Sequence, residues 1–270
     1  MIIVPDTISY YEAAKALYLY GEIDSTRPIL FSLISGLPFL FGNISIQIYY
    51  WWNVLINIVL YFFSLKMVYK LTNKTGVILF ISLIGVIGHI FLAVTEIMVM
   101  TMLLYGYYQY KHGKGLKVII LMIFLLGFIK PVFWTGYFGM YDIGKHTVSE
   151  YLLKEDSFII ITYFKNLFSN MIGRSWIIYN YIGKPLAYLT MFQNLMMCII
   201  AFILLWKKQY FVIIPIYLIL IHGLSHSQGD RFHIMFYPLV LVIMLNYLEK
   251  KHQLKFNNIY ELFKKRFSNG

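Results

Sequence analysis

Long apolar stretches without charge alternate with short polar segments along this chain. Residues 28–65 and 209–229 contain no charged side chain, and residues 75–110 contain one. A helix needs about 20 mainly apolar residues to cross the roughly 30 Å hydrocarbon layer of a membrane. The pattern therefore predicts an all-α polytopic integral membrane protein with about seven spans. The expected spans lie at about 46–66, 75–94, 96–112, 116–133, 186–206, 209–226 and 231–248.

The segments between the expected spans define the rest of the organisation. Residues 1–28 and 134–185 are expected to be external elements of one transmembrane domain that covers residues 1–250. Residues 10–20 and 157–173 combine apolar positions at helical spacing with charged positions, which predicts interfacial helices. Residues 251–270 are predicted to form a basic tail.

Composition supports a membrane protein and excludes three other classes. Hydrophobic residues make up 60% of the 270 positions and charged residues 13%, with a mean hydropathy of +0.68. This is more apolar surface than one water-soluble core can bury, so a soluble enzyme and a disordered chain are excluded. The single cysteine, Cys198, excludes an internal disulfide and a cysteine-based zinc cluster.

The distribution of charge predicts an orientation in the membrane. One set of segments, 66–74, 111–117, 207–208 and 249–270, contains fourteen lysines and arginines and two acids, whereas the other side contains nine and ten. The positive-inside rule makes the basic side cytoplasmic, including the C-terminus, in what we expect to be a bacterial inner or plasma membrane. The net charge of +11 then reflects orientation and anionic membrane lipids, and no nucleic-acid partner is expected.

Two charged residues are expected within or near the hydrocarbon layer. Glu96 is predicted at the outer turn of a tight hairpin between Lys74 and Lys111, either exposed to water or lining a cavity. Lys130 follows Lys117 by 13 residues, which is about 20 Å of helix. It is expected either to extend to the interface or to face a wet cavity that holds an anion.

Further polar residues are expected on the outer face. Asp6 is either a helix N-cap or a catalytic carboxylate. Arg27, which precedes Pro28, either fixes an extended turn or binds phosphate. Arg231 either anchors its helix at the interface or binds phosphate.

A cluster of histidines is a weak candidate for a metal site. His222 and His226 lie four residues apart and so share a helical face, with Asp230 close behind them. Such groups can bind zinc, but the glutamate of an HExxH motif is absent. Hydrogen-bonded or headgroup-facing histidines are the alternative, and the sequence specifies no definite cofactor beyond an optional divalent metal.

The order of several short motifs resembles the GT-C membrane glycosyltransferases, which include protein mannosyltransferase-like, aminoarabinose-transferase-like and rhizobial galacturonosyltransferase-like enzymes. The motifs are Pro-Asp-x-x-x-Tyr-Tyr-x-x-Ala from residue 5, Arg-Pro-x-Leu-Phe from residue 27, the hairpin acid Glu96, Lys130-Pro and Arg231-Phe-His. The resemblance covers most of residues 1–248. Relative to that family, this chain is expected to lack the first transmembrane helix.

The resemblance implies transfer of a sugar from a polyprenyl-phosphate carrier to a glycan, lipid or protein acceptor on the extracytoplasmic face. It places Asp6 as the general base or as a ligand of the acceptor and any metal. Glu96 is the second candidate carboxylate, and Arg27, Lys130, Arg231 and Tyr10 are the candidates for binding substrate or phosphate. The alternatives are a transporter or flippase for a lipid-linked saccharide and a non-catalytic remnant.

Overall fold

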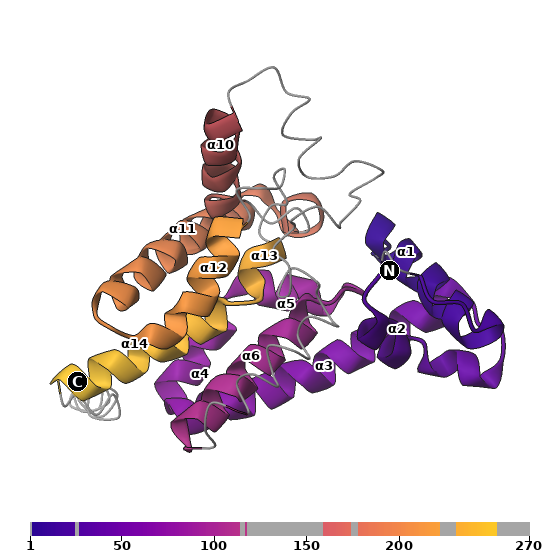
Figure 1. Cartoon of the computed structure of the whole chain (residues 1–270), viewed down its shortest axis with the longest axis horizontal. Coiled ribbons are helices and arrows are strands. Elements are labelled where there is room, and N and C mark those ends of the chain that lie inside the picture. The colour runs from indigo at the N-terminus through magenta and orange to yellow at the C-terminus, as the bar shows by residue number, and fades with distance from the viewer. Residues whose placement is uncertain are drawn as a thin grey trace, which may run out of the picture.

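The computed structural model describes residues 2–24, 27–113, 117, 159–173, 178–221 and 231–252. Within these ranges the regular elements are all helices, which agrees with the predicted all-α class. Figure 1 shows α3 running from the N-terminal helices to the end of the molecule where α14 finishes. Two ends therefore organise the fold, and α3 joins them.

The N-terminal end is built from four short helical segments. Helix α1 (Pro5–Lys15) continues into the π-helical segment η1 (Ala16–Tyr20) and stops at Gly21, whose φ of 70° glycine adopts without steric cost. Helix α2 (Ile29–Ser35) and the 3₁₀ segment η2 (Leu37–Phe41) follow. The expected interfacial helix at 10–20 is thus present as parts of α1 and η1.

The longest helix, α3 (Ile46–Leu71), begins where the sequence predicts a span. The side chain of Ser45 caps it by accepting a hydrogen bond from the Ile48 N–H at 3.5 Å. It packs along α6 (Glu96–Lys111), and a buried Ser64–Thr101 hydrogen bond of 2.9 Å joins the two. The predicted span at 96–112 therefore corresponds to a single helix.

The predicted span at 75–94 is not one continuous helix. It is divided into α4 (Lys74–Ile81) and α5 (Ile84–Ile90). The break lies at Ser82 and Leu83, where the Ser82 hydroxyl donates to the Leu79 carbonyl at 2.7 Å and Leu83 leaves the helical conformation with ψ 80°. A local hydrogen bond of this kind competes with helix continuation.

The C-terminal half contains one long helix and several short ones. Helix α10 (Ile159–Met171) occupies the expected interfacial segment, and η3 (Ile178–Ile182) precedes the long helix α11 (Lys184–Trp206). The segments η4 (Tyr210–Val212) and α12 (Ile213–Ile221) then lead, across residues outside the described ranges, to α13 (Arg231–Ile234) and α14 (Tyr237–His252).

The predicted span at 231–248 is also divided. Helix α13 ends at Ile234, and α14 starts at Tyr237 with Pro238 as its second residue. Proline has no N–H to donate, so it fits the first turn of a new helix and not the middle of a continuous one. The span expected at 209–226 starts with a 3₁₀ turn, and Pro215 lies in the first turn of α12.

Two of the described helices, α3 with 26 residues and α11 with 23, are long and apolar enough to cross a membrane. The expected total of seven spans is therefore not reproduced within the described ranges. The span predicted at 116–133 lies outside them except for Lys117. Exposed apolar side chains follow one face of each long helix, including Trp51, Leu55, Phe192 and Phe202.

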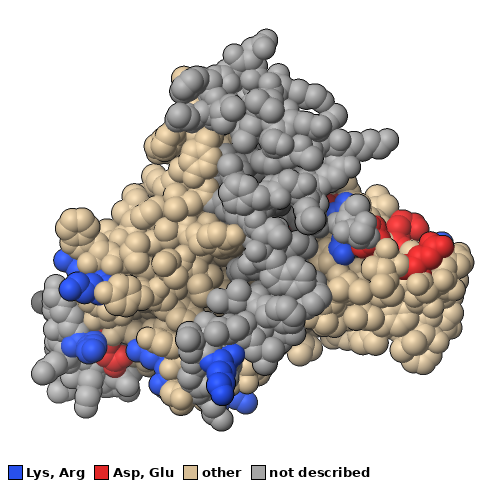
Figure 2. All heavy atoms as spheres, in the orientation of Figure 1, with Lys and Arg blue, Asp and Glu red and all other residues tan. Residues whose placement is uncertain are grey.

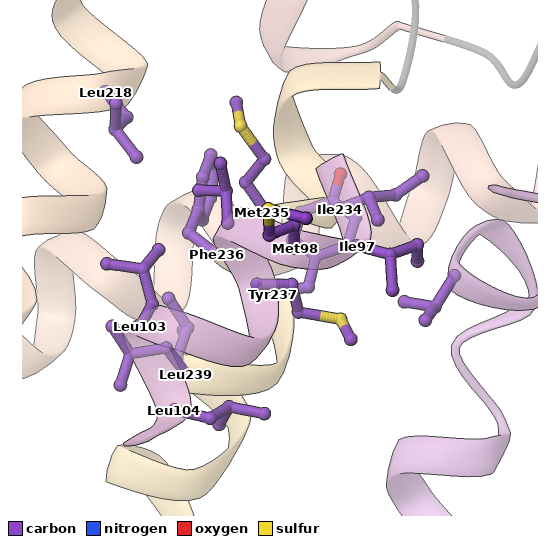
Figure 3. Packing of buried hydrophobic residues seen from close by; sticks show 14 of the residues in the cluster. Ile97, Met98, Leu103, Leu104, Leu218, Ile234, Met235, Phe236, Tyr237 and Leu239 are labelled. Carbon is purple, nitrogen blue, oxygen red and sulfur yellow. The ribbon is translucent and has the colours of Figure 1, made fainter. Parts of the chain in front are cut away.

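The core is centred on α6 and α14. Figure 3 shows the first turn of α6, with Ile97 and Met98, beside Ile234 and Met235 at the junction of α13 and α14. Helix α14 packs against α3, α4, α6 and α11, and Leu239 to Ile243 are all buried. A helix that is covered on most sides carries apolar residues all round, which explains the apolar run from Leu239 to Leu245.

Candidate functional site

An ion pair joins two of the predicted site residues at the N-terminal end. Nη1 of Arg27 lies 3.6 Å from Oδ1 of Asp6, and the two side chains are 27% and 28% exposed. The pair joins α1 to the segment that enters α2, two elements separated by η1. Because both groups reach solvent, a ligand phosphate or hydroxyl can approach them without unfolding either helix.

The structure does not support Asp6 as the N-cap of α1. The N-cap is Val4, which has no side chain able to cap, and Pro5 occupies the first turn. Proline is favoured at the start of a helix because its missing N–H would have no intrahelical partner there. The helix therefore starts before Asp6, whose carboxylate lies in the first turn and faces Arg27.

The ring of Tyr10 contacts the arginine of the same ion pair. The guanidinium carbon of Arg27 lies 5.4 Å from the centre of the Tyr10 ring, and Tyr10 is 5% exposed. Phe31 of α2 packs edge-on against that ring at 4.8 Å. Asp6 and Tyr10 are one helical turn apart, so one face of α1 presents a carboxylate and an aromatic ring to the same arginine.

Arg27 also takes part in the turn that the sequence predicts. Its N–H donates to the Asp24 carbonyl at 3.3 Å, and the next residue, Pro28, is the extended N-cap of α2 with φ −63° and ψ 115°. The side chain and the backbone of Arg27 therefore have separate roles. Arg27 thus forms the predicted turn into α2 and also lies beside Asp6.

A second tyrosine fixes α2 relative to the N-terminal helix. The Tyr18 hydroxyl donates to the Leu33 carbonyl at 2.6 Å. Burial raises the pKa of Tyr18, because the phenolate would lose solvation. This hydrogen bond joins η1 to α2.

Thr7 is a buried residue that sequence reasoning did not single out. It is 0% exposed, and its hydroxyl has no hydrogen-bond partner among the described residues. A buried hydroxyl without a partner costs about 1–3 kcal/mol. In the sequence, the one sign that Thr7 lies near the candidate site is its position next to Asp6 in the first turn of α1.

Glu96 is buried at the start of α6. Its side chain is 0% exposed, so the water-exposed alternative is wrong. Glu96 lies in the first turn of a helix, where the partial positive charge of the N-terminus favours a carboxylate. The first turn of α6 thus positions an acid inside the protein rather than at its surface.

A chain of hydrogen bonds connects the Asp6 segment with the turn that precedes Glu96. The Ile2 N–H donates to the Tyr50 hydroxyl at 3.3 Å, and that hydroxyl donates to the Phe91 carbonyl at 2.9 Å. The Asn57 amide donates to the carbonyls of Ile90 and Leu92 at 3.3 and 2.6 Å. The segment before Asp6 and the turn before Glu96 are therefore both attached to the first half of α3.

Arg231 opens α13, which packs against α5 and α6. Its neighbour on the same helix, His233, is buried and contacts the rings of Phe236 and Tyr237 at 5.6 and 5.4 Å. The side chain of Arg231 lies outside the described parts of the structure, as do Lys130, His222, His226 and Asp230. The predicted histidine metal site and the Lys130 site stay predictions.

No cluster of three or more His, Cys, Asp and Glu side chains suitable for a metal ion occurs in the described ranges. Cys198 is buried within α11, among apolar side chains.

An apolar groove of about 600 Å³ lies between η2 and the first half of α3. It is open on one side, and its walls carry almost no polar surface. The residues that line it are Leu37, Pro38, Leu40, Phe41, Ile48, Trp51, Trp52 and Leu55. The sequence predicts Trp51 and Trp52 as interfacial aromatics, and the groove adds a concave shape that sequence does not reveal.

The described charges are divided between the two ends of the molecule. Figure 2 shows acidic side chains gathered over the N-terminal helices and basic side chains gathered at the opposite end. The N-terminal end contains Asp6, Glu12, Glu22 and Asp24.

Comparison with known proteins gives no relative from which a role could be taken. No family model, no curated protein and no solved structure matches this chain.

Proposed function

We propose that this chain is a membrane glycosyltransferase that moves a sugar from a polyprenyl-phosphate donor to an envelope glycan, lipid or protein acceptor. The observation that carries the proposal is the partly exposed Asp6–Arg27 ion pair on the Tyr10 ring. In the membrane, the acidic end faces outward and the basic end faces the cytoplasm.

The reaction needs two kinds of group that this end offers. A carboxylate takes the proton of the acceptor hydroxyl while the acceptor oxygen bonds to the anomeric carbon. The bond between that carbon and the phosphate oxygen breaks, and the electron pair leaves with the polyprenyl phosphate. A cation stabilises the charge that develops on the phosphate.

We assign these roles to Asp6 and Arg27. Asp6 is the base, and Arg27 exchanges part of its contact with Asp6 for the donor phosphate, which its planar guanidinium can bind through two oxygens. Tyr10 keeps the guanidinium in place during that exchange. Glu96, which is buried in the first turn of α6, is the second candidate carboxylate.

The surroundings of this end suit a lipid-linked donor. The groove beside η2 has the apolar walls and the lateral opening that a polyprenyl chain requires. The exposed apolar faces of α3 and α11 suit lipid contact. An enzyme embedded in this way draws its donor from the membrane plane and needs no nucleotide site.

The test is transfer by the purified full-length chain in vesicles. A panel of radiolabelled short-chain polyprenyl-phosphate hexoses and pentoses serves as donor, and release of polyprenyl phosphate is the readout. Asp6→Asn removes the base without changing side-chain size, so release falls by about 100-fold or more. Glu12→Gln, on the same helix and exposed, is the matched control and keeps full activity.

Two outcomes overturn the proposal. If the chain moves labelled donor across the bilayer without cleaving it, and Asp6→Asn does not affect that movement, the protein is a transporter. If neither cleavage nor movement occurs with any donor of the panel, the transferase assignment fails and the remnant alternative stands.

A further inference from the structure

The end of the molecule opposite Asp6 carries a group of exposed lysines that the proposed reaction does not use. They come from the ends of α3, α6, α11 and α14 and from the start of α4, together with Lys117. We call this group the basic surface; its described members are Lys66, Lys70, Lys74, Lys111, Lys117, Lys207, Lys208 and Lys250. Glu249 is the described acid among them.

Aromatic contacts bring three of the five helix ends together. Nζ of Lys70 lies 5.4 Å from the ring centre of Tyr108, which joins α3 to α6. Tyr107 of α6 contacts the Phe211 ring of η4 at 5.0 Å, and η4 directly follows the lysine pair at the end of α11. Nζ of Lys111 lies 5.8 Å from the centre of the Tyr107 ring.

The remaining two helix ends meet across a close contact. A Cβ on Gly76 of α4 would lie 3.3 Å from Cδ1 of Leu245 of α14, so the Leu245 side chain packs against the backbone of α4 at Gly76. Lys74 begins α4, where the Asn73 side chain caps the first turn by accepting from the N–H groups of Thr75 and Gly76. Lys250 lies in the last turn of α14. Like charges from all five helix ends are thus concentrated at one end (Figure 2).

Exposed aromatic side chains accompany these lysines in the sequence. Tyr69 precedes Lys70, Tyr110 precedes Lys111 and Trp206 precedes Lys207, and all three aromatics are more than half exposed. Tyrosine and tryptophan are enriched where a membrane meets water, and lysines extend from the same level into the headgroup layer. The pairing therefore indicates a lipid surface as the partner.

We infer that the basic surface binds the headgroups of anionic phospholipids and gives the protein a preference for them over zwitterionic lipids. The ammonium groups contact headgroup phosphates, and the aromatic side chains lie at the boundary with the acyl chains. The inference is independent of the transferase reaction and rests on the membrane-embedded state.

The turn after α11 supplies a variant that separates charge from folding. Lys208 has φ 59°, a left-handed conformation that glycine adopts without strain. Its N–H donates to the Leu205 carbonyl at 2.8 Å. Lys208→Gly therefore removes a positive charge at a position whose backbone conformation glycine adopts without strain, so the fold should be retained.

The experiment measures phosphatidylglycerol retained by the full-length chain after extraction from vesicles that contain equal parts of phosphatidylglycerol and phosphatidylcholine. Wild-type protein retains an excess of phosphatidylglycerol. The triple variant Lys70→Gln, Lys74→Gln, Lys111→Gln reduces its association constant for phosphatidylglycerol by about fivefold for each lysine removed. Lys208→Gly alone reduces the association constant for phosphatidylglycerol by about fivefold.

The matched control removes the same charge elsewhere. Lys15, Lys165 and Lys184 belong to α1, α10 and the start of α11, and the triple exchange to glutamine leaves the preference unchanged. Equal losses in both triple variants would show a net-charge effect and overturn the inference. So would a wild-type chain with no preference for phosphatidylglycerol.

Nucleic acid is the competing partner for a basic surface with aromatic neighbours. A fluorescent single-stranded RNA is titrated into the detergent-solubilised chain with and without phosphatidylglycerol. Displacement of the RNA by the lipid, or no RNA binding, agrees with the inference. RNA binding that is lost in the first triple variant and resists phosphatidylglycerol would assign the surface to nucleic acid.

Discussion

The two ends of the molecule organise charge in different ways. At the acidic end, Arg27 is paired with Asp6 and lies on the Tyr10 ring, so opposite charges are held at short range in one place. At the basic end, Lys70 and Lys111 lie on tyrosine rings, and the lysines are spread over five helix ends. Paired charges define a site the size of a small molecule, whereas spread like charges suit an extended anionic surface.

The largest expected effect concerns the sides of the membrane on which the two ends lie. Glu22→Cys and Lys208→Cys each introduce an exposed thiol, and the native Cys198 is buried. A membrane-impermeant maleimide should label Glu22→Cys in intact cells and Lys208→Cys only after permeabilisation. Labelling of both thiols from the same side would contradict the difference in orientation between the two ends.

The next effect concerns the two carboxylates Glu96 and Glu249, one from each end. Glu96→Gln should reduce sugar transfer by less than the roughly 100-fold loss expected for Asp6→Asn, because Asp6 is the base and Glu96 is buried inside the protein. Glu249→Gln, at the basic end, should leave transfer unchanged. The measurement is release of polyprenyl phosphate in vesicles, with circular dichroism to verify helix content. Equal activities of the two variants would remove Glu96 from the site.

A smaller effect concerns the contact between α3 and the turn before Glu96. Asn57→Ala removes the donor to two buried carbonyls and should lower the free energy of unfolding by about 1–3 kcal/mol. Asn53 is also buried, but its amide donates within its own helix, to Tyr49 at 2.8 Å. Asn53→Ala should therefore cost less in a denaturant titration in detergent, and the reverse order would contradict this role of Asn57.

The smallest effect concerns the hydroxyl of Thr7. Thr7→Val replaces a buried hydroxyl that has no described partner by a methyl group of similar size, and should raise the free energy of unfolding by about 1 kcal/mol. Thr101→Val is the control, because Thr101 shares a hydrogen bond with Ser64 and donates to the Ile97 carbonyl at 2.8 Å. It should be destabilising in the same thermal melt. A loss of stability in Thr7→Val would show that the hydroxyl is bonded.

Much of the helical organisation could be predicted from apolar patterning. The predicted span at 46–66 and helix α3 begin at the same residue, and α11 starts two residues before the predicted span at 186–206 and ends with it. Both helices present a wide apolar face, which is the property that patterning detects. The buried helix α14 shows the limit of this reasoning, because a helix packed inside a protein and a helix in lipid have the same apolar sequence.

Breaks in helices were harder to predict because they depend on single residues. Pro238 at the start of α14 was a usable signal for the division of 231–248, since proline favours the first turn of a helix. The break at Ser82 depends on a hydrogen bond between the Ser82 hydroxyl and a carbonyl three residues earlier. Serine does not break most helices, so no pattern in the sequence identifies that one.

The candidate site was predictable by residue type and not by contact. Asp6 and Arg27 were predicted to lie on the same outer face, and the structure brings them together with Tyr10. The hydrogen bonds of Tyr50 and Asn57 connect residues more than 30 positions apart, so local sequence contains no sign of them. Long-range pairs of this kind are set by tertiary packing, as is the burial of Glu96.

The length of α3 makes the protein responsive to bilayer thickness. In the proposed membrane-embedded state, its apolar stretch from Ile46 to Leu65 corresponds to about 30 Å, close to a hydrocarbon layer of about 30 Å, so a change in bilayer thickness changes the tilt of the helix. Tyr50 and Asn57 attach the segments bearing Asp6 and Glu96 to this helix, and those segments move with it. Thinner membranes increase the tilt and reorient both carboxylates relative to the surface, so transfer rates should vary with lipid chain length.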